Sequence, residues 1–311
     1  MNRSGMMRDS LLWLADQGVE GHIFISLGSL RLAAPSLWRN SIKIVVDCGL
    51  SPAALEFLMP LRREQVHVIP VSSVSNEPPD TRAGIVAMRT RIHVSSFLER
   101  LQRAGDVPRA TLCLVCDADT VFLREFVIPE PRVVSDLSVM PEWDNRDGVE
   151  RPLLLLRQST FTLPLTEVHV SELSAALEIQ ENTLRNLPTY NTGVFSFALG
   201  TQFVDAWRRE YDRINTIRNA AGQLLFSPYA AEQNALSIAI QRGTIIPDSL
   251  PRRFNQFPPR PPHSWPQDTA IAHFITFGRN HCEARYKLWF DTRDSVRQDG
   301  WIPAALLPAI I

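Results

Sequence analysis

Two aspartates follow an apolar run in the middle of the chain. Residues 111–116 read T-L-C-L-V-C, and Asp117, Ala118 and Asp119 come directly after them. An unbroken apolar run favours a strand buried on both faces of a parallel sheet, and ligands of such sheets bind at the carboxyl ends of the strands. Alternate residues of an extended segment point the same way, so Asp117 and Asp119 can bind one cation together. Two carboxylates suit Mg²⁺ or Mn²⁺ better than zinc.

The stretch D-A-D-T-V at 117–121 fits two kinds of enzyme. In phosphatases of the haloacid dehalogenase type the first aspartate is a nucleophile, which would make Asp117 the phosphoryl acceptor. Those enzymes also need a downstream lysine and a further acidic pair, but here only Lys287 lies downstream and no Asp-Asp or G-D-x-x-x-D follows. In nucleotide-sugar transferases a metal ion joins the two aspartates to a diphosphate. A structural alternative is that one aspartate caps the next turn and the other is solvated.

Composition sets the broad class of the protein. The chain has 311 residues, 45% of them hydrophobic, which is enough for one large α/β domain or two halves that share a sheet. A formal net charge of −1 gives no support for nucleic acid as a partner. Because there is no signal-peptide core and no apolar run of about 18 residues, we expect a cytoplasmic protein with at most peripheral membrane contact. Cys113 and Cys116 are expected to be buried thiols rather than half of a zinc site.

The first third of the chain alternates between strand and helix patterns. Leu27, Gly28 and Ser29 close the first predicted strand, where small residues let a ligand approach the backbone, and Asp47 closes the second. Ser51 is the expected N-cap of a helix that begins with the following proline. This order predicts a mostly parallel central sheet flanked by helices, and the lack of G-x-G-x-x-G disfavours a dinucleotide dehydrogenase. The predicted elements are a helix at 8–17, a strand at 21–30, a helix through 35–38, and strands at 41–50 and 65–71.

The rest of the chain continues the pattern less regularly. Arg89 and Arg91 lie on a predicted helix that leads into the aspartate motif, and we expect one of them to meet phosphate. Asn191 and Gly193 open a later strand, and Ser171 is the expected cap of the helix before it. The predicted elements are a helix at 82–104, a strand at 136–143, a helix at 171–186, a strand at 190–200, and an irregular proline-rich loop at 251–268.

Five blocks, taken in order, resemble retaining nucleotide-sugar glycosyltransferases of the family 8 type. That family has the glycosyltransferase A fold, a Rossmann-like α/β fold. The resemblance implies one such domain over 1–311, with a nucleotide-binding half at 21–126, an acceptor-binding half at 127–290 and a C-terminal tail at 291–311. It also favours a transferase over a phosphatase. The blocks are D-A-D (117–119), Y-N-T-G-V (190–194), A-E-Q-N-A-L (231–236), R-R-F-N (252–255) and H-F-I-T-F-G-R (273–279).

The same resemblance implies Mn²⁺, or Mg²⁺, bound by Asp117, Asp119 and His273. The imidazole ligand favours Mn²⁺. After this histidine the chain departs from the family, because Gly278 comes five residues later instead of three and Arg279 follows in place of a lysine. A guanidinium can still bind a donor phosphate with two parallel hydrogen bonds. The full set of expected donor-binding residues is Leu27, Gly28, Ser29, Asp47, Arg89, Arg91, Asp117, Ala118, Asn191, Gly278 and Arg279.

The resemblance further implies that Glu232 binds sugar hydroxyls and that Gln233 lies under the reacting carbon during a transfer with retention. Taken locally, both read equally well as polar residues of a helix surface. Asn191 orients sugar hydroxyls or caps the turn before its strand. Retention needs no dedicated general base, whereas an inverting reaction would point to Asp144 or His169.

The expected donor is a UDP-sugar, and the expected acceptor is a glycan or glycolipid. The acceptor should contact residues 144–188 and 251–268, which fit the family least. Trp143, next to the first of these segments, and Phe161 and Trp265 within them can stack on sugar rings. The competing hypothesis is a protein that keeps the fold for binding and has lost catalysis. A complete metal-ligand set argues for the enzyme.

Overall fold

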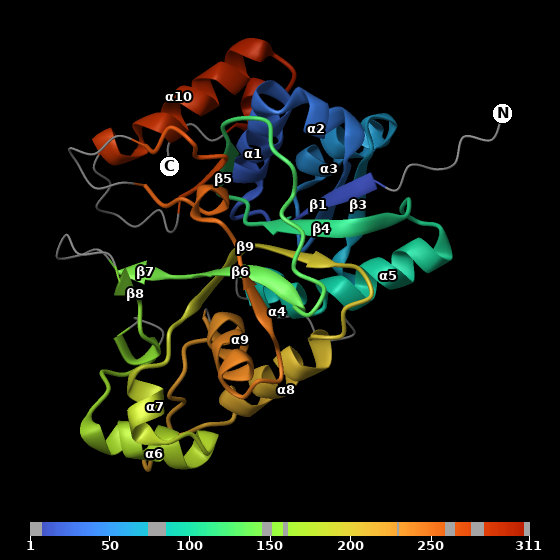
Figure 1. Ribbon diagram of the computed structural model, residues 1–311. Coiled ribbons are helices and arrows are strands. Elements are labelled where there is room, and N and C mark those ends of the chain that lie inside the picture. The colour runs from blue at the N-terminus through green and yellow to red at the C-terminus, as the bar shows by residue number, and fades with distance from the viewer. Residues whose placement is uncertain are drawn as a thin grey trace.

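The computed structural model describes residues 8–73, 85–144, 151–157, 161–228, 230–258, 265–274 and 283–307. At its centre lies a seven-stranded sheet in the order β10-β6-β9-β4-β1-β2-β3 (Figure 1). All neighbours in this sheet are parallel except β9, which runs antiparallel to β4 and to β6. The strands are β1 (Arg8–Ala15), β2 (Ile42–Asp47), β3 (Val66–Pro70), β4 (Ala110–Cys116), β6 (Leu137–Pro141), β9 (Tyr190–Ala198) and β10 (Pro247–Ser249). The prediction of a mostly parallel central sheet is confirmed.

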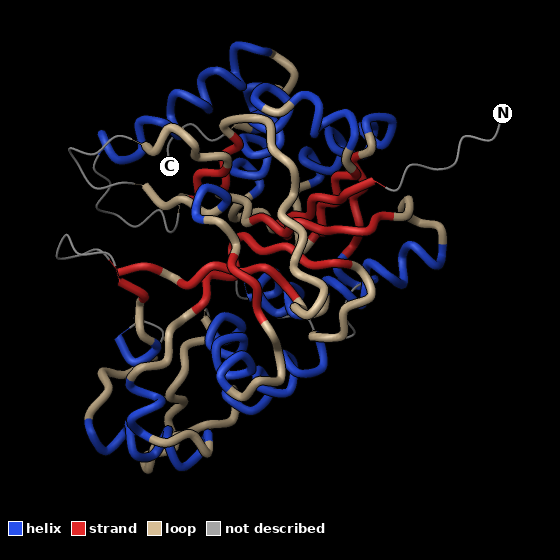
Figure 2. The backbone as a smooth tube through the Cα atoms, in the orientation of Figure 1, coloured by secondary structure: helices blue, strands red, loops and turns tan. Residues whose placement is uncertain are grey.

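Helices cover both faces of this sheet, so the protein has a hydrophobic core on each side (Figure 2). Alternate residues of β1 show this directly: Leu11 and Trp13 are buried in one core, and Leu12 and Leu14 in the other. The first core is closed by α1 (Glu20–Ala33), α2 (Pro35–Asn40), α3 (Pro52–Leu58) and α10 (Glu283–Asp299). The second is closed by α4 (Ile85–Ile92), α5 (Val94–Ala104), α6 (Glu167–Leu177), α7 (Glu181–Arg185), α8 (Val204–Ile214) and α9 (Ala231–Gln241).

Two small antiparallel sheets and five short 3-10 helices complete the described fold. The pair β5 (Thr120–Phe122) and β11 (Ile271–His273) joins the aspartate motif to a segment far along the chain. The other pair is β7 (Trp143–Asp144) with β8 (Arg151–Pro152). The 3-10 helices are η1 (Met59–Glu64), η2 (Val71–Ser73), η3 (Leu155–Arg157), η4 (Arg252–Phe254) and η5 (Ala304–Leu306).

The first two predicted elements are wrong, because strand and helix are exchanged. The predicted helix at 8–17 is β1, and the predicted strand at 21–30 lies within α1. Both segments are buried on nearly every side: β1 lies in the middle of the sheet, and α1 buries eight consecutive residues from Ile23 to Leu30. Such elements lack the polar face that gives a helix or strand its period, so an apolar run alone does not separate them.

This exchange removes the reason for placing Leu27, Gly28 and Ser29 beside a donor. All three lie in the buried middle of α1. A Cβ on Gly28 would lie 2.5 Å from Val296 of α10, so glycine lets the two helices pack closely. The Ser29 hydroxyl accepts a hydrogen bond from the Phe122 backbone N–H at 3.0 Å. These residues therefore hold α1 against its neighbours.

Several local predictions are confirmed and others are corrected. Ser51 caps α3 as expected, with its side chain accepting from the Ala54 N–H. The predicted helix at 82–104 is divided in its described part into α4 and α5, at His93. The predicted helix at 171–186 is two helices, and Thr166 rather than Ser171 caps the first of them. His169 completes that cap, because its Nδ1 accepts from the Thr166 backbone N–H at 3.2 Å. His169, the alternative general base for an inverting reaction, therefore takes part in a helix cap.

Two findings bear on membranes and thiols. Among the described helices, none has both the length and the apolar character needed to cross a membrane. Cys113 and Cys116 are buried and free, as predicted. Burial raises the pKa of the Cys113 thiol to about 12, so at neutral pH it is a protonated core residue.

Candidate metal centre and active site

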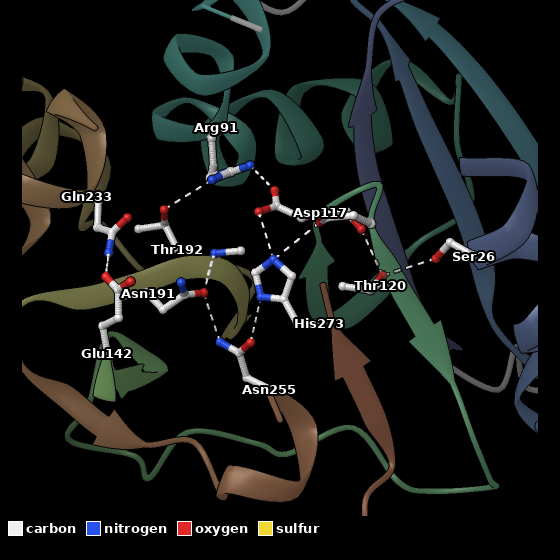
Figure 3. Close-up of polar contacts among 12 residues, drawn as sticks. Ser26, Arg91, Asp117, Thr120, Glu142, Asn191, Thr192, Gln233, Asn255 and His273 are labelled. Atoms are coloured by element: carbon white, nitrogen blue, oxygen red, sulfur yellow. Dashed lines mark hydrogen bonds and ion pairs between the residues drawn. The ribbon is translucent and has the colours of Figure 1, made fainter. Parts of the chain in front are cut away.

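Asp117, Asp119 and His273 meet at the carboxyl end of β4. The strand ends at Cys116, the D-A-D turn follows, and β5 begins at Thr120, which pairs with His273 at the end of β11. His273 Nε2 lies 3.4 Å from Asp117 Oδ2 and 3.3 Å from Asp119 Oδ1. One potential ligand atom from each residue lies within 4.8 Å of the other two. The β5–β11 pairing therefore brings His273 from far along the chain to the two aspartates, and Figure 3 shows its contact with Asp117.

Gly193 on the neighbouring strand β9 makes room for this cluster. Its carbonyl oxygen accepts a hydrogen bond from the Asp117 N–H at 2.6 Å, so the two backbones are in direct contact. A Cβ at this position would lie 2.2 Å from His273 Cε1 and 2.5 Å from Asp117 Oδ2. Any side chain here would displace two of the three candidate ligands. This contact gives a physical reason for the glycine in Y-N-T-G-V.

The charges in the cluster favour a bound cation. Burial alone would lower the pKa of His273, but the carboxylates of Asp119 and Asp117 raise it to about 9. Burial would raise the pKa of Asp117, but Arg91 and His273 lower it below its usual range. The two carboxylates thus favour a positive charge beside them, and a divalent cation can supply it. Two carboxylates and an imidazole form a suitable donor set for such an ion.

Arg91 connects this cluster to α9. Its guanidinium pairs with Asp117 Oδ1, and its Nη1 lies 3.1 Å from Thr192 Oγ1 and 3.4 Å from Glu232 Oε1. The side chain is buried, with 9% of its surface exposed. Either Arg89 or Arg91 was predicted to meet phosphate; in this structure the terminal nitrogens of Arg91 contact protein carboxylates and a hydroxyl. Its described contacts place one positive charge between the carboxyl groups of Asp117 and Glu232.

Glu232 and Gln233 lie in the first turn of α9, facing β9 and the end of β6. Glu232 is 3% exposed, and its Oε1 also accepts from the Thr192 hydroxyl at 3.2 Å. Gln233 donates from Nε2 to Glu142 Oε2 at 2.5 Å, which turns its amide oxygen away from Glu142 (Figure 3). Glu232 is thus buried beside Arg91, and Gln233 is held by Glu142. Neither Glu232 nor Gln233 is simply a solvated residue on the helix surface.

Replacing Glu232 by glutamine should change how stability depends on pH. Burial raises the pKa of Glu232 to about 7 from 4.5, and Arg91 only partly offsets this effect. The folded state therefore favours the neutral form, and this contribution to stability is fully present below pH 4.5 and is lost as pH rises through about 7. Glutamine cannot ionise, so the Glu232→Gln variant should gain stability relative to wild type over this range, by on the order of 3 kcal/mol. Urea unfolding of both proteins in EDTA at pH 5 and pH 8 measures the difference. The same difference at both pH values would contradict the shifted pKa.

Two other predicted donor residues have different contacts. Arg89 Nε donates to the Tyr211 hydroxyl of α8 at 3.1 Å. Asp47 lies at the end of β2 as predicted, but its Oδ1 accepts the backbone N–H groups of Gly49 at 2.9 Å and Leu50 at 2.7 Å. That oxygen stabilises the turn after the strand.

The structure also shows polar residues that the sequence analysis missed. Glu142 lies within the predicted strand at 136–143, and an acid near a strand end is a usable signal. Asp16 was hidden by the wrong assignment of 8–17 as helix. It follows β1 directly, and because Trp13 pairs with Cys116 in register, Asp16 stands at the same sheet edge as the D-A-D turn. Its Oδ1 accepts from the Gly18 N–H at 2.9 Å.

Asn191 also lies in the site, and its side-chain oxygen already accepts two hydrogen bonds. Asn191 Oδ1 accepts from the Gly193 N–H and from Asn255 Nδ2, each at 3.0 Å. Ala118, another of the expected donor-binding residues, is buried within the turn. Gly278 and Arg279 lie outside the described residues, and so does the side chain of Asp144.

The three aromatic residues predicted to contact an acceptor have different surroundings. Trp143 is partly buried in β7. Trp265 packs on Phe274, the residue after β11, with ring centroids 5.5 Å apart. Phe161 packs on the buried Phe226 at 5.1 Å, which makes it part of the second core. Trp265 is thus next to the segment that carries the candidate metal ligand.

No family model matches the chain, and no curated protein matches it by sequence. Solved structures do match it. The galactosyltransferase LgtC in complex with donor and acceptor sugar analogues is 12% identical over 94% of this chain and 100% of that one, with a TM-score of 0.52. An active-site mutant of LgtC is 13% identical over 92% and 95%, with a TM-score of 0.51. The bifunctional glycosyltransferase WbbM in its apo form is 11% identical over 95% of this chain and 50% of that one, with a TM-score of 0.54. The chain therefore has the α/β fold of these glycosyltransferases.

Proposed function

We propose that the protein is a metal-dependent glycosyltransferase that moves a sugar from a UDP-sugar to a glycan or glycolipid, with retention at the anomeric carbon. One observation carries the proposal: the Asp117, Asp119 and His273 cluster lies at the sheet edge and is connected through Arg91 to Glu232. The fold agrees, since one structural neighbour is a galactosyltransferase bound to donor and acceptor sugar analogues.

In this proposal Asp117, Asp119 and His273 bind Mn²⁺, or Mg²⁺, and the donor diphosphate lies against the same sheet edge. The ion supplies positive charge that stabilises the departing diphosphate. Gly193 keeps space for the ligands, and Arg91 offsets the charge of the buried acids around them. The D-A-D turn would thereby supply two carboxylates to one ion, and β11 would supply the imidazole of His273.

The sugar is proposed to lie between the metal cluster and α9. Arg91 Nε and Glu232 Oε2 are buried and have no hydrogen-bond partner within the described parts of the chain, so both are suited to sugar hydroxyls. Glu142 holds the Gln233 amide by its nitrogen, which leaves the amide oxygen to stabilise positive charge at the anomeric carbon. That amide orientation supports Gln233 as the catalytic residue.

The proposed reaction exchanges one bond at the anomeric carbon for another. The bond to the diphosphate oxygen breaks and its electron pair leaves with the diphosphate, while the acceptor hydroxyl oxygen forms the new bond on the same face. The departing phosphate oxygen takes the acceptor proton, so no separate base is required.

A panel of UDP-, GDP-, CDP- and dTDP-sugars, each with Mn²⁺, tests the proposal. Without an acceptor, slow hydrolysis of one donor should appear in proton NMR spectra, and the early free sugar should keep the donor's anomeric configuration. An inverted early product would contradict retention. Binding of a nucleotide sugar without turnover of any of them, even with a panel of oligosaccharide acceptors, would favour a protein that binds and does not catalyse.

A further inference from the structure

A buried chain of amide groups leads from the backbone of β9 to the candidate metal ligand on β11. The Gly193 N–H donates to Asn191 Oδ1 at 3.0 Å, and Asn255 Nδ2 donates to the same oxygen at 3.0 Å. Asn255 Oδ1 then lies 2.8 Å from His273 Nδ1 (Figure 3). Asn191 is 5% exposed, Asn255 0% and His273 2%, so bulk water does not compete for these contacts.

The direction of every hydrogen bond in this chain follows from its first donor. A backbone N–H can only donate, so the Asn191 atom that faces Gly193 must be the carbonyl oxygen. That oxygen also faces Asn255, which must therefore present its NH₂ group to Asn191 and its own oxygen to His273. An amide oxygen can only accept, so Nδ1 of His273 must carry a proton. In the neutral imidazole, Nε2 is then left with a free lone pair.

The backbone keeps Asn255 in place independently of its side chain. This residue follows η4, and the segment around it runs beside β11. The Ala270 N–H donates to the Arg253 oxygen at 2.8 Å, and the Gln256 N–H donates to the Ile271 oxygen at 3.1 Å. The His273 N–H in turn donates to the Gln256 oxygen at 2.9 Å. The backbone on both sides of Asn255 is thus fixed relative to the strand that carries the imidazole.

We propose that Asn255 is a positioning residue that sets the tautomer and ring orientation of His273, with Asn191 and the Gly193 N–H as its anchor. This inference rests on the metal site of the proposed function. It gives the R-R-F-N block a role: the asparagine holds Nδ1–H, so that the Nε2 lone pair faces Asp117 and Asp119. Outer-sphere partners of this kind orient histidine ligands and keep them basic.

The hydrogen-bonded chain Gly193–Asn191–Asn255–His273, called the relay below, is tested by calorimetric titration of Mn²⁺ without nucleotide. Replacing Asn255 by leucine removes the acceptor for Nδ1–H, and we expect Mn²⁺ affinity to fall about 10- to 100-fold. Asn191→Leu should have a similar effect, because the Asn255 amide is then free to turn over. Asn191→Asp should bind Mn²⁺ at least as tightly as wild type, since a carboxylate accepts both hydrogen bonds that Asn191 Oδ1 accepts now. Asn234→Leu is the matched control: Asn234 is equally buried, but both polar atoms of its side chain have no hydrogen-bond partner in the described structure.

The outcomes separate the relay from the metal site itself. Wild-type affinity in Asn255→Leu, or a loss in Asn191→Asp as large as in Asn191→Leu, would overturn the relay while leaving the metal site intact. A wild-type protein that takes up no Mn²⁺ would overturn the metal site and the relay together.

Long-range proton–nitrogen NMR spectra of the Zn²⁺-loaded wild type need no variant of the relay. The His273 signals are identified by their loss in His273→Gln, and we expect the proton on Nδ1. A proton on Nε2 would overturn the proposal even if the leucine variants do not fold.

Discussion

Asparagine in place of Asp119 should reduce Mn²⁺ affinity more than about 100-fold, beyond the loss typical of residues outside the ligand shell. Asp119 Oδ1 lies 3.3 Å from His273 Nε2, so the carboxylate faces the other candidate ligands directly. The amide keeps the shape of the side chain but removes its charge, and hard divalent cations bind charged oxygens most strongly. UDP binding should fall with Mn²⁺ binding, because two phosphate charges then lack a counter-ion. Calorimetric titration of Mn²⁺, and then of UDP, measures both effects.

Asp106→Asn is a matched control for this prediction. Asp106 is an exposed aspartate just before β4, at the opposite end of the strand from the D-A-D turn. The substitution makes the same change of charge in a segment that flanks the same strand. Loss of Mn²⁺ binding in both variants would point to net charge or folding, and unchanged Mn²⁺ binding in Asp119→Asn would remove Asp119 from the ligand set.

Alanine in place of Gln233 should reduce turnover about 100- to 1,000-fold while leaving metal-dependent UDP binding unchanged. Removal of one preorganised group that stabilises transition-state charge has a cost of this size. The residue lies across the site from Asp117, and its contact with Glu142 at 2.5 Å does not involve the candidate metal ligands. Initial rates with the donor found by the nucleotide-sugar panel measure turnover, and calorimetry measures UDP binding.

Gln241→Ala is the matched control, because Gln241 is exposed at the other end of the same helix α9. Its turnover should match wild type. Full activity in Gln233→Ala would show that the amide is not the catalytic group. A loss of UDP binding equal to the loss of turnover would show that Gln233 acts in binding.

The sequence predicted best those elements whose local pattern is unambiguous. The apolar run before Asp117 is a buried strand, and the serine before Pro52 caps a helix, as expected. The first two elements failed for a physical reason. β1 and α1 are buried all round, so their sequences carry no polar period that would separate a strand from a helix. Because of this error, Asp16 was not predicted to follow a strand, and Gly28 was predicted at the end of a strand although it lies within α1.

The site could be predicted as a set of residues but not as a set of contacts. Aspartates two apart at a strand end imply a metal site, and the resemblance implied His273 as the third ligand. Nothing in the sequence shows that β11 pairs with β5, or that Glu142 holds the Gln233 amide. Those contacts join segments far apart in the chain, and tertiary packing decides them. Arg91 illustrates the limit, since its place on a helix was predicted but its carboxylate partners were not.

The central claim is that Asp117, Asp119 and His273 form a metal site that holds a nucleoside diphosphate. Calorimetric titration of UDP into the wild-type protein tests it most directly, once with Mn²⁺ and once with EDTA. We predict saturable binding with Mn²⁺ and none detectable in EDTA. Equal affinity under the two conditions would contradict the account.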